Sequence, residues 1–149
     1  MITREPGYCL CISTADCVPV LIYDKKHSAI AAIHAGWRGT VAYIVRDTLL
    51  RMEKEFGTSG EDVVACIGPS ISLASFEVGE EVYEAFQKNG FDMPRISIRK
   101  EETGKHHRLV GSEPDANPCF RCAVRTSGAC PDMYVYSSRR VFLGKAFGH

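Results

Sequence analysis

The fold is decided by the stretch TADCVPVLIYDKKHSAIAAIHAGWRG, residues 14–39. It contains two β-favouring apolar runs, residues 18–23 and 29–34, which are separated by a short polar segment. A further run of the same kind, residues 9–13, lies just upstream. The stretch therefore predicts consecutive short strands, and the glycines at its end predict a turn into the next element.

Downstream of this stretch, the spacing of apolar residues changes to that of a helix. An apolar stripe predicts a helix over about 40–56 with Gly57 as its stop. Residues 63–67 and 133–137 are predicted as strands, and residues 80–89 as a helix that ends at Gly90. Strands followed by helices predict a layered α/β domain. The stripe consists of Val41, Ile44, Val45, Thr48, Leu49 and Met52.

The composition indicates one globular domain, residues 1–149. Hydrophobic residues make up 45% and charged residues 24%, which is enough for a single core. Lys plus Arg equals Asp plus Glu at 18 each, so no positive field exists to attract nucleic acid or an anionic membrane surface. Residues 18–23, the longest apolar run, are far too few to span a membrane. Seven cysteines without a regular framework favour a reducing compartment, and we expect a soluble, cytoplasmic protein.

Cys17 and His34 are the residues with the clearest chemical potential. Cys17 stands at the start of one predicted strand and His34 at the end of the next, so pairing of these strands can bring a thiolate and an imidazole together. Such a pair either binds Zn²⁺ or acts as a nucleophile with its base, and Asp16 could orient the site in both cases. The structural alternative is a small buried thiol and a hydrogen-bonded core histidine.

Gly36, Trp37, Arg38 and Gly39 connect the second strand to the predicted helix. Glycines allow close backbone approach, N–H groups at a helix start attract anions, and a guanidinium such as that of Arg38 binds an oxyanion through two hydrogen bonds. This predicts a site for a phosphate-sized anion. The alternative is a tight turn in which Trp37 fills the core and Arg38 is solvated.

Four runs of the sequence resemble the laccase-domain family, also called YfiH-like or polyphenol oxidase-like. They are TADCVPV (14–20), HAGWRG (34–39), IGPSI (67–71) and FEVGEEV (76–82), and the likeness covers about residues 1–87. The resemblance implies a three-layer, mixed-sheet α/β sandwich of the YfiH-like type and a zinc ion held by one Cys and two His. It also implies phosphorolysis of adenosine, inosine, guanosine and methylthioadenosine, with adenosine deamination in some members. Purine nucleoside and phosphate are therefore the expected partners.

Carried over residue by residue, the resemblance makes Cys17 and His34 two of the zinc ligands, with Arg38 beside the phosphate or substrate. The family's third ligand is a His in a Gln-Val-His-Gly segment upstream of the cysteine motif, and residues 1–16 contain no His. We therefore expect the chain to be the C-terminal portion of the family's domain, incomplete at the N-terminus. A site with two ligands predicts little or no turnover.

Residues 106–130 differ from the sequence that is usual in the family, and they contain scattered Gly, Pro and Cys, so we expect irregular structure there. One explanation is a frameshift, because codons read one base later can encode the family's usual segment. The cysteines in this region would then have no functional role. Further on, Arg139 and Arg140 resemble the family's Ser-x-Arg-Arg, whose arginines could hold substrate anions. A solvated basic turn is the alternative.

Three other functions remain open beside zinc-dependent phosphorolysis. Cys17 could be the nucleophile of a hydrolase or deamidase, with His34 as its base. Copper oxidation of polyphenols ranks last, since five His residues cannot readily furnish a multicopper centre. The third possibility is that the chain is an inactive remnant, because one zinc ligand is missing and the sequence of residues 106–130 is disrupted.

Overall fold

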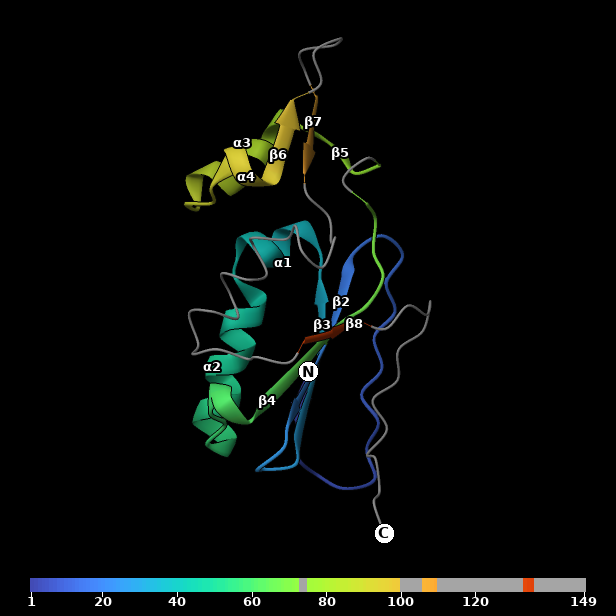
Figure 1. Ribbon diagram of the computed structural model, residues 1–149, viewed down its shortest axis with the longest axis vertical. Helices are drawn as coiled ribbons and strands as arrows, with labels where there is room; N and C mark the ends of the chain where they lie inside the picture. The colour runs from blue at the N-terminus through green and yellow to red at the C-terminus, as the bar shows by residue number, and fades with distance from the viewer. Residues whose placement is uncertain (73–74, 100–105, 110–132, 136–149) are drawn as a thin grey trace.

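The computed structural model describes residues 1–72, 75–99, 106–109 and 133–135 (Figure 1). Within these residues, the main sheet has five strands in the order β1-β3-β2-β4-β8. Neighbouring strands are antiparallel except β4 and β8, which are parallel, so the sheet is mixed. The strands predicted at 18–23, 29–34 and 63–67 are confirmed as β2, β3 and β4, and the final predicted strand as β8. The bounds are β1 Ile2–Thr3, β2 Val18–Asp24, β3 Ala29–Ala35, β4 Val63–Ile67 and β8 Met133–Val135.

Helix α2, Ile44–Phe56, packs along one face of this sheet. Its Val45, Leu49 and Met52 are buried against alternate residues of β2, β3 and β4, and full burial of each such side chain contributes about 1.5–3 kcal/mol. The helix ends at Gly57, whose φ of 76° suits glycine, so the predicted stop is confirmed. The buried members of this core are Val20, Ile22, Ala29, Ala31, Ile33, Ala35, Val45, Leu49, Met52, Val63, Ala65 and Ile67.

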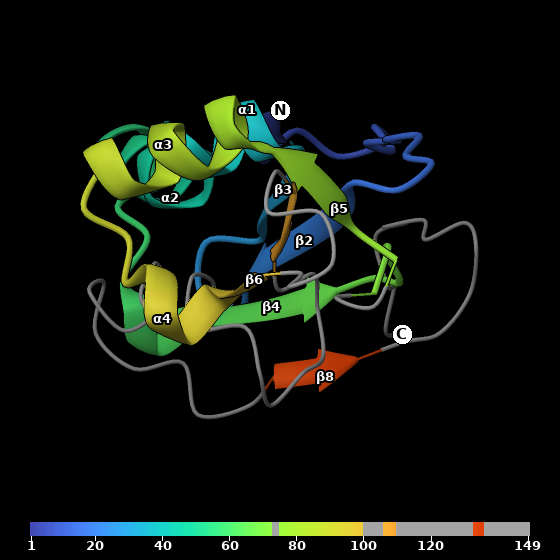
Figure 2. The same ribbon diagram turned by 90° about the horizontal axis from the view of Figure 1, so that it is seen from above.

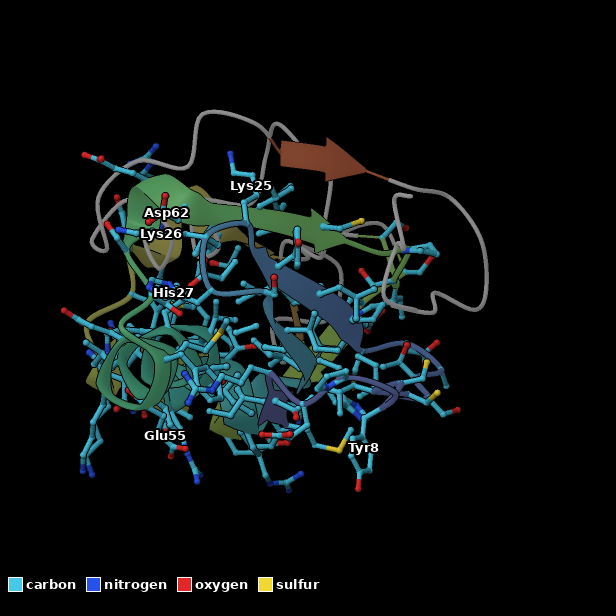
Figure 3. The ribbon with its side chains drawn as sticks, turned by 90° about the horizontal axis from the view of Figure 1, so that it is seen from below. Tyr8, Lys25, Lys26, His27, Glu55 and Asp62 are labelled. Carbon is cyan, nitrogen blue, oxygen red and sulfur yellow. The ribbon has the colours of Figure 1, made fainter. Side chains whose placement is uncertain are left out.

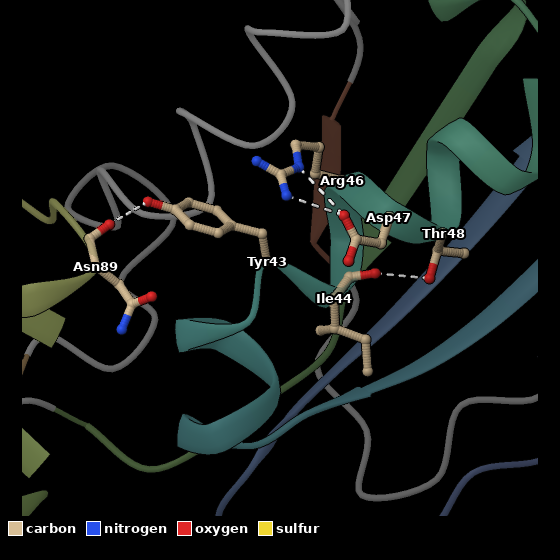
Figure 4. A network of polar contacts seen from close by, with 6 residues as sticks. All are labelled: Tyr43, Ile44, Arg46, Asp47, Thr48 and Asn89. Atoms are coloured by element: carbon tan, nitrogen blue, oxygen red, sulfur yellow. Dashed lines mark hydrogen bonds and ion pairs between the residues drawn. The ribbon is translucent and has the colours of Figure 1, made fainter. Parts of the chain in front are cut away.

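The apolar stripe predicted one helix over 40–56, and this prediction is wrong because the segment is broken. Helix α1 covers Trp37–Val41, and Tyr43, just before α2, lies in the left-handed region with φ 56°. The Tyr43 ring stacks on Phe91 with 5.0 Å between ring centroids. The Tyr43 hydroxyl donates to the Asn89 carbonyl at 2.6 Å, as Figure 4 shows. These contacts stabilise the interruption between α1 and α2. Because they involve a segment distant in sequence, the spacing of apolar residues over 40–56 could not predict the interruption.

The turn between β2 and β3 is held by a buried carboxylate. Asp24 is fully buried and accepts the N–H groups of Lys26 and His27, each at 2.9 Å. Its second oxygen contacts Nδ1 of His27, also at 2.9 Å. In Figure 3 this turn lies close to Asp62, whose carbonyl accepts the Lys25 N–H at 2.9 Å. The turn is therefore tied both to itself and to η1, the short 3₁₀ helix Gly60–Asp62 that precedes β4.

These contacts set the charge of Asp24. Burial by itself raises the pKa of the carboxyl, whereas the hydrogen bonds from His27 and from the Lys26 N–H lower it. The net pKa lies below the ordinary value, because hydrogen bonds to the charged form outweigh the cost of burying it. Asp24 is thus a buried carboxylate that stays ionised at neutral pH.

A smaller antiparallel sheet, in the order β5-β7-β6, lies with α3 and α4 beyond the α1 end of the main sheet (Figure 1, Figure 2). Trp37 and Val41 of α1 pack against its apolar cluster and so join the two parts of the structure. The bounds are β5 Glu77–Gly79, α3 Glu80–Lys88, α4 Met93–Ile96, β6 Ser97–Arg99 and β7 His106–Leu109. The buried members of the cluster are Val78, Val82, Phe86, Met93 and Ile96.

The mixed-sheet α/β class predicted from the sequence is confirmed, as is the predicted helix at 80–89. Two local predictions are wrong. Residues 9–13 form no strand, because they have only a single bridge, at Leu10, within the described part of the chain. Residues 106–109, expected to be irregular, form β7, because β5 and β6 flank this segment and pair with it. No helix among the described residues is long and apolar enough to cross a membrane.

Candidate functional site

The register of β2 and β3 brings Cys17 and His34 to one end of the main sheet. Val18 pairs with Ala35 and Pro19 with His34 in an antiparallel ladder. The residue before β2 is Cys17, so it lies across from Gly36, the residue after β3. Cys17 and His34 therefore lie at the same end of the sheet, where one strand begins and its neighbour ends.

Gly36 marks the point at which the two side chains converge. A Cβ atom on Gly36 would lie 3.1 Å from Cys17 Sγ and 3.9 Å from His34 Nε2. Sulfur and nitrogen thus both lie within 4 Å of one point above the Gly36 backbone. Cys17 is half-buried and His34 is exposed, so a ligand has access from solvent. A side chain at position 36 would crowd the sulfur, which is a reason for glycine that the local sequence did not reveal.

The segment after β4 supports Cys17 from its other side. The N–H of Gly68 donates to the Pro19 carbonyl at 2.9 Å, and the N–H of Ile71 donates to the Asp16 carbonyl at 3.0 Å. The backbone on both sides of Cys17 is therefore fixed. The Asp16 side chain is exposed, and its expected role in orienting the site stays a prediction.

Trp37 and Arg38 lie beside this point at the start of α1. Trp37 is half-buried against the second cluster, and the Arg38 guanidinium carbon lies 4.2 Å from the centroid of the Trp37 ring. Stacking fixes the flat face of the guanidinium and leaves its N–H edges available to an anion, because Arg38 is exposed. Helix α1 has only five residues, so the guanidinium must provide most of the attraction for an anion. A Cβ atom on Gly39 would lie 3.4 Å from the Ile44 side chain, which is an ordinary contact.

The donor chemistry of the site fits a zinc ion in part. A cysteine sulfur and an imidazole nitrogen are typical zinc ligands, and they converge here. Among the described residues, however, no group of three or more His, Cys, Asp and Glu side chains could hold a metal ion. The described residues also show no hydrogen bond between Cys17 and His34. A cysteine nucleophile activated by a histidine base would make such a bond. Arg139 and Arg140 lie outside the described residues.

Comparison with known proteins gives consistent results. The family described as "Multi-copper polyphenol oxidoreductase laccase" matches residues 1–111. A purine nucleoside phosphorylase of Bacteroides thetaiotaomicron is 97% identical over 107 residues, which are 72% of this chain and 40% of that protein. The adenosine deaminase RL5 of an unknown prokaryotic organism is 41% identical over 107 residues, with the same two coverages. This chain thus spans about 40% of the length of these relatives.

Solved structures agree with the fold. The YfiH protein of Bacillus licheniformis superposes with a TM-score of 0.74 at 24% identity, over 92% of this chain and 49% of that one. YlmD of Geobacillus stearothermophilus gives a TM-score of 0.73 at 23% identity, over 93% and 49%. The arrangement of strands and helices described above is therefore shared with longer proteins.

Proposed function

Because this chain belongs to the multi-copper polyphenol oxidoreductase laccase family, we propose that it supplies two ligands of a zinc site used for purine nucleoside phosphorolysis. The observation that carries the proposal is the convergence of Cys17 Sγ and His34 Nε2 above Gly36, next to the stacked Arg38. The relative named purine nucleoside phosphorylase, 97% identical over 107 residues, supports the choice of reaction.

The reaction requires that phosphate and nucleoside lie side by side. A phosphate oxygen attacks the anomeric carbon, the bond from that carbon to the purine nitrogen breaks, and the purine takes up a proton from solvent. The products are ribose 1-phosphate and the free base. Arg38 holds the phosphate through its open N–H edges, and the stacked Trp37 ring keeps the guanidinium in place. Cys17 and His34 would hold the zinc ion, which would supply Lewis-acid chemistry when bound.

The described residues provide only two of the ligands that a zinc site needs. We infer that the remaining protein ligand comes from outside the described residues, in keeping with a chain that spans about 40% of its relatives. This chain alone is expected to bind zinc weakly and to turn over little nucleoside. Arg139 and Arg140 remain candidates for holding substrate anions.

The test has two parts with one matched control. Co²⁺ is titrated into the full chain as a spectroscopic substitute for zinc, and the sulfur-to-cobalt charge-transfer band is measured. Cys17→Ser should abolish this band, whereas Cys66→Ser should retain it, because Cys66 lies in β4 opposite Leu21 and away from Gly36. Equal bands in the two variants would contradict the assignment of Cys17.

Activity is measured on the longer Bacteroides thetaiotaomicron relative with the matching cysteine replaced by serine. Inosine and phosphate are supplied, and ribose 1-phosphate is quantified with and without a chelator. We expect activity to fall in both the variant and the chelated protein. Undiminished activity after metal removal would argue against a metal-dependent mechanism.

Adenosine deamination is a second candidate, favoured by the relative named adenosine deaminase RL5. Here water replaces the amino group of adenosine, which leaves as ammonia, and inosine is formed. The two reactions can be distinguished because only phosphorolysis requires phosphate. Ammonia released from adenosine in phosphate-free buffer indicates deamination, and free base formed only with phosphate indicates phosphorolysis.

A further inference from the structure

Two thiols lie close together in the segment between β1 and β2. Cys9 and Cys11 are both exposed, and their sulfur atoms are 3.8 Å apart. They are two residues apart in sequence, and side chains at such positions point to the same side of an extended backbone. Neither belongs to the Cys17 and His34 pair described above.

We propose that Cys9 and Cys11 form a redox-active dithiol that exchanges with low-molecular-weight disulfides. One cysteine thiolate attacks a sulfur of the external disulfide, and the first thiol leaves. The second cysteine, after losing its proton, attacks the mixed disulfide and releases the second thiol. The protein gains one S–S bond and loses two electrons and two protons, and the external disulfide is reduced to two thiols.

The geometry favours this exchange over inert thiols. The sulfur atoms must approach from 3.8 Å to a bond length of about 2.05 Å, which needs only side-chain rotation and a small backbone shift. Exposure gives the external disulfide access to either sulfur. A disulfide across a single intervening residue is strained, so this bond should be readily reduced again.

The contact between the two thiols also affects the ionisation of Cys9. The hydrogen bond with Cys11 is the largest cause that raises the pKa of Cys9, followed by desolvation and by repulsion from a charged Cys11. The contact with Cys11 therefore lowers the fraction of Cys9 that is ionised. Either thiol can attack the external disulfide first, and the other thiol then closes the bond.

The experiment uses the full chain with oxidised glutathione, followed by acid quenching and alkylation of the remaining thiols. Digestion with a protease that cleaves before aspartate separates residues 1–15, which hold Cys9 and Cys11, from Cys17, because Asp16 starts the next peptide. Mass spectrometry should show the 1–15 peptide two hydrogen atoms lighter and unalkylated. A bond that joins this peptide to Cys17, or simple glutathione adducts on both thiols, would overturn the proposal.

Single variants test whether the second thiol is needed to close the disulfide. Cys9→Ser should accumulate a stable glutathione adduct on Cys11, since the closing thiol is missing. Cys11→Ser should likewise accumulate a stable adduct on Cys9, and Cys66→Ser should close the disulfide as the unaltered chain does. Absence of a stable adduct in both Cys9→Ser and Cys11→Ser, or failure of Cys66→Ser to close the disulfide, would overturn the assignment of the site.

Discussion

Replacing Gly36 by alanine tests the geometry of the metal site without removing a ligand. Gly36 has φ −77° and ψ 168°, an extended conformation that alanine adopts freely, so the backbone is not strained. The added Cβ lies 3.1 Å from Cys17 Sγ, so the sulfur must shift by a few tenths of an ångström. Ligand distances in metal sites are held to about ±0.2 Å. We expect the affinity for Co²⁺ or Zn²⁺ to fall by about tenfold or more, equal to about 1.4 kcal/mol or more.

The assay is a titration with Co²⁺, followed through the sulfur-to-cobalt absorption, together with thermal unfolding without metal. Unfolding should change by less than about 1 kcal/mol, because only a half-buried thiol is displaced. Gly39→Ala is the matched control for metal affinity, since its Cβ would make ordinary contact with Ile44 at 3.4 Å and lies within α1. If Gly36→Ala binds the metal as tightly as Gly39→Ala, the Cys17 sulfur is not a ligand in this arrangement.

Three further predictions concern reactivity, pH and packing. Cys17 should react rapidly with iodoacetamide only after chelation, and rapid reaction in the metal-loaded protein would favour a nucleophile instead. The lowered pKa of Asp24 means that its contribution to stability is present above the ordinary value of 3.8 and is lost as the pH falls through the folded value. Asp24→Asn should therefore flatten the acid limb of a stability-against-pH curve measured by urea unfolding, and an unchanged limb would refute this. Met52→Ala should destabilise the protein by about 2–5 kcal/mol in the same measurement, whereas Leu50→Ala, at a position 54% exposed, should change it by less than about 0.5 kcal/mol; equal losses would show that α2 does not pack as described.

Much of the fold could be predicted because its signals are local. The strands β2, β3 and β4 are short apolar runs bounded by turn residues, and the Gly57 stop of α2 follows from a backbone conformation that glycine favours. The apolar stripe of α2 likewise predicts which face is buried, because helical spacing and burial coincide. Each of these features depends on residues only a few positions apart.

The sequence by itself determined the α/β class, the main strands and the two residue types suited to zinc, Cys17 and His34. Only the tertiary structure decided what depends on distant partners. The break before α2 depends on the contacts of Tyr43 with Phe91 and Asn89, and β7 exists because β5 and β6 flank it. The convergence of thiol and imidazole above Gly36 follows from the register of β2 and β3, since strand pairing sets distances between residues that are far apart in the chain.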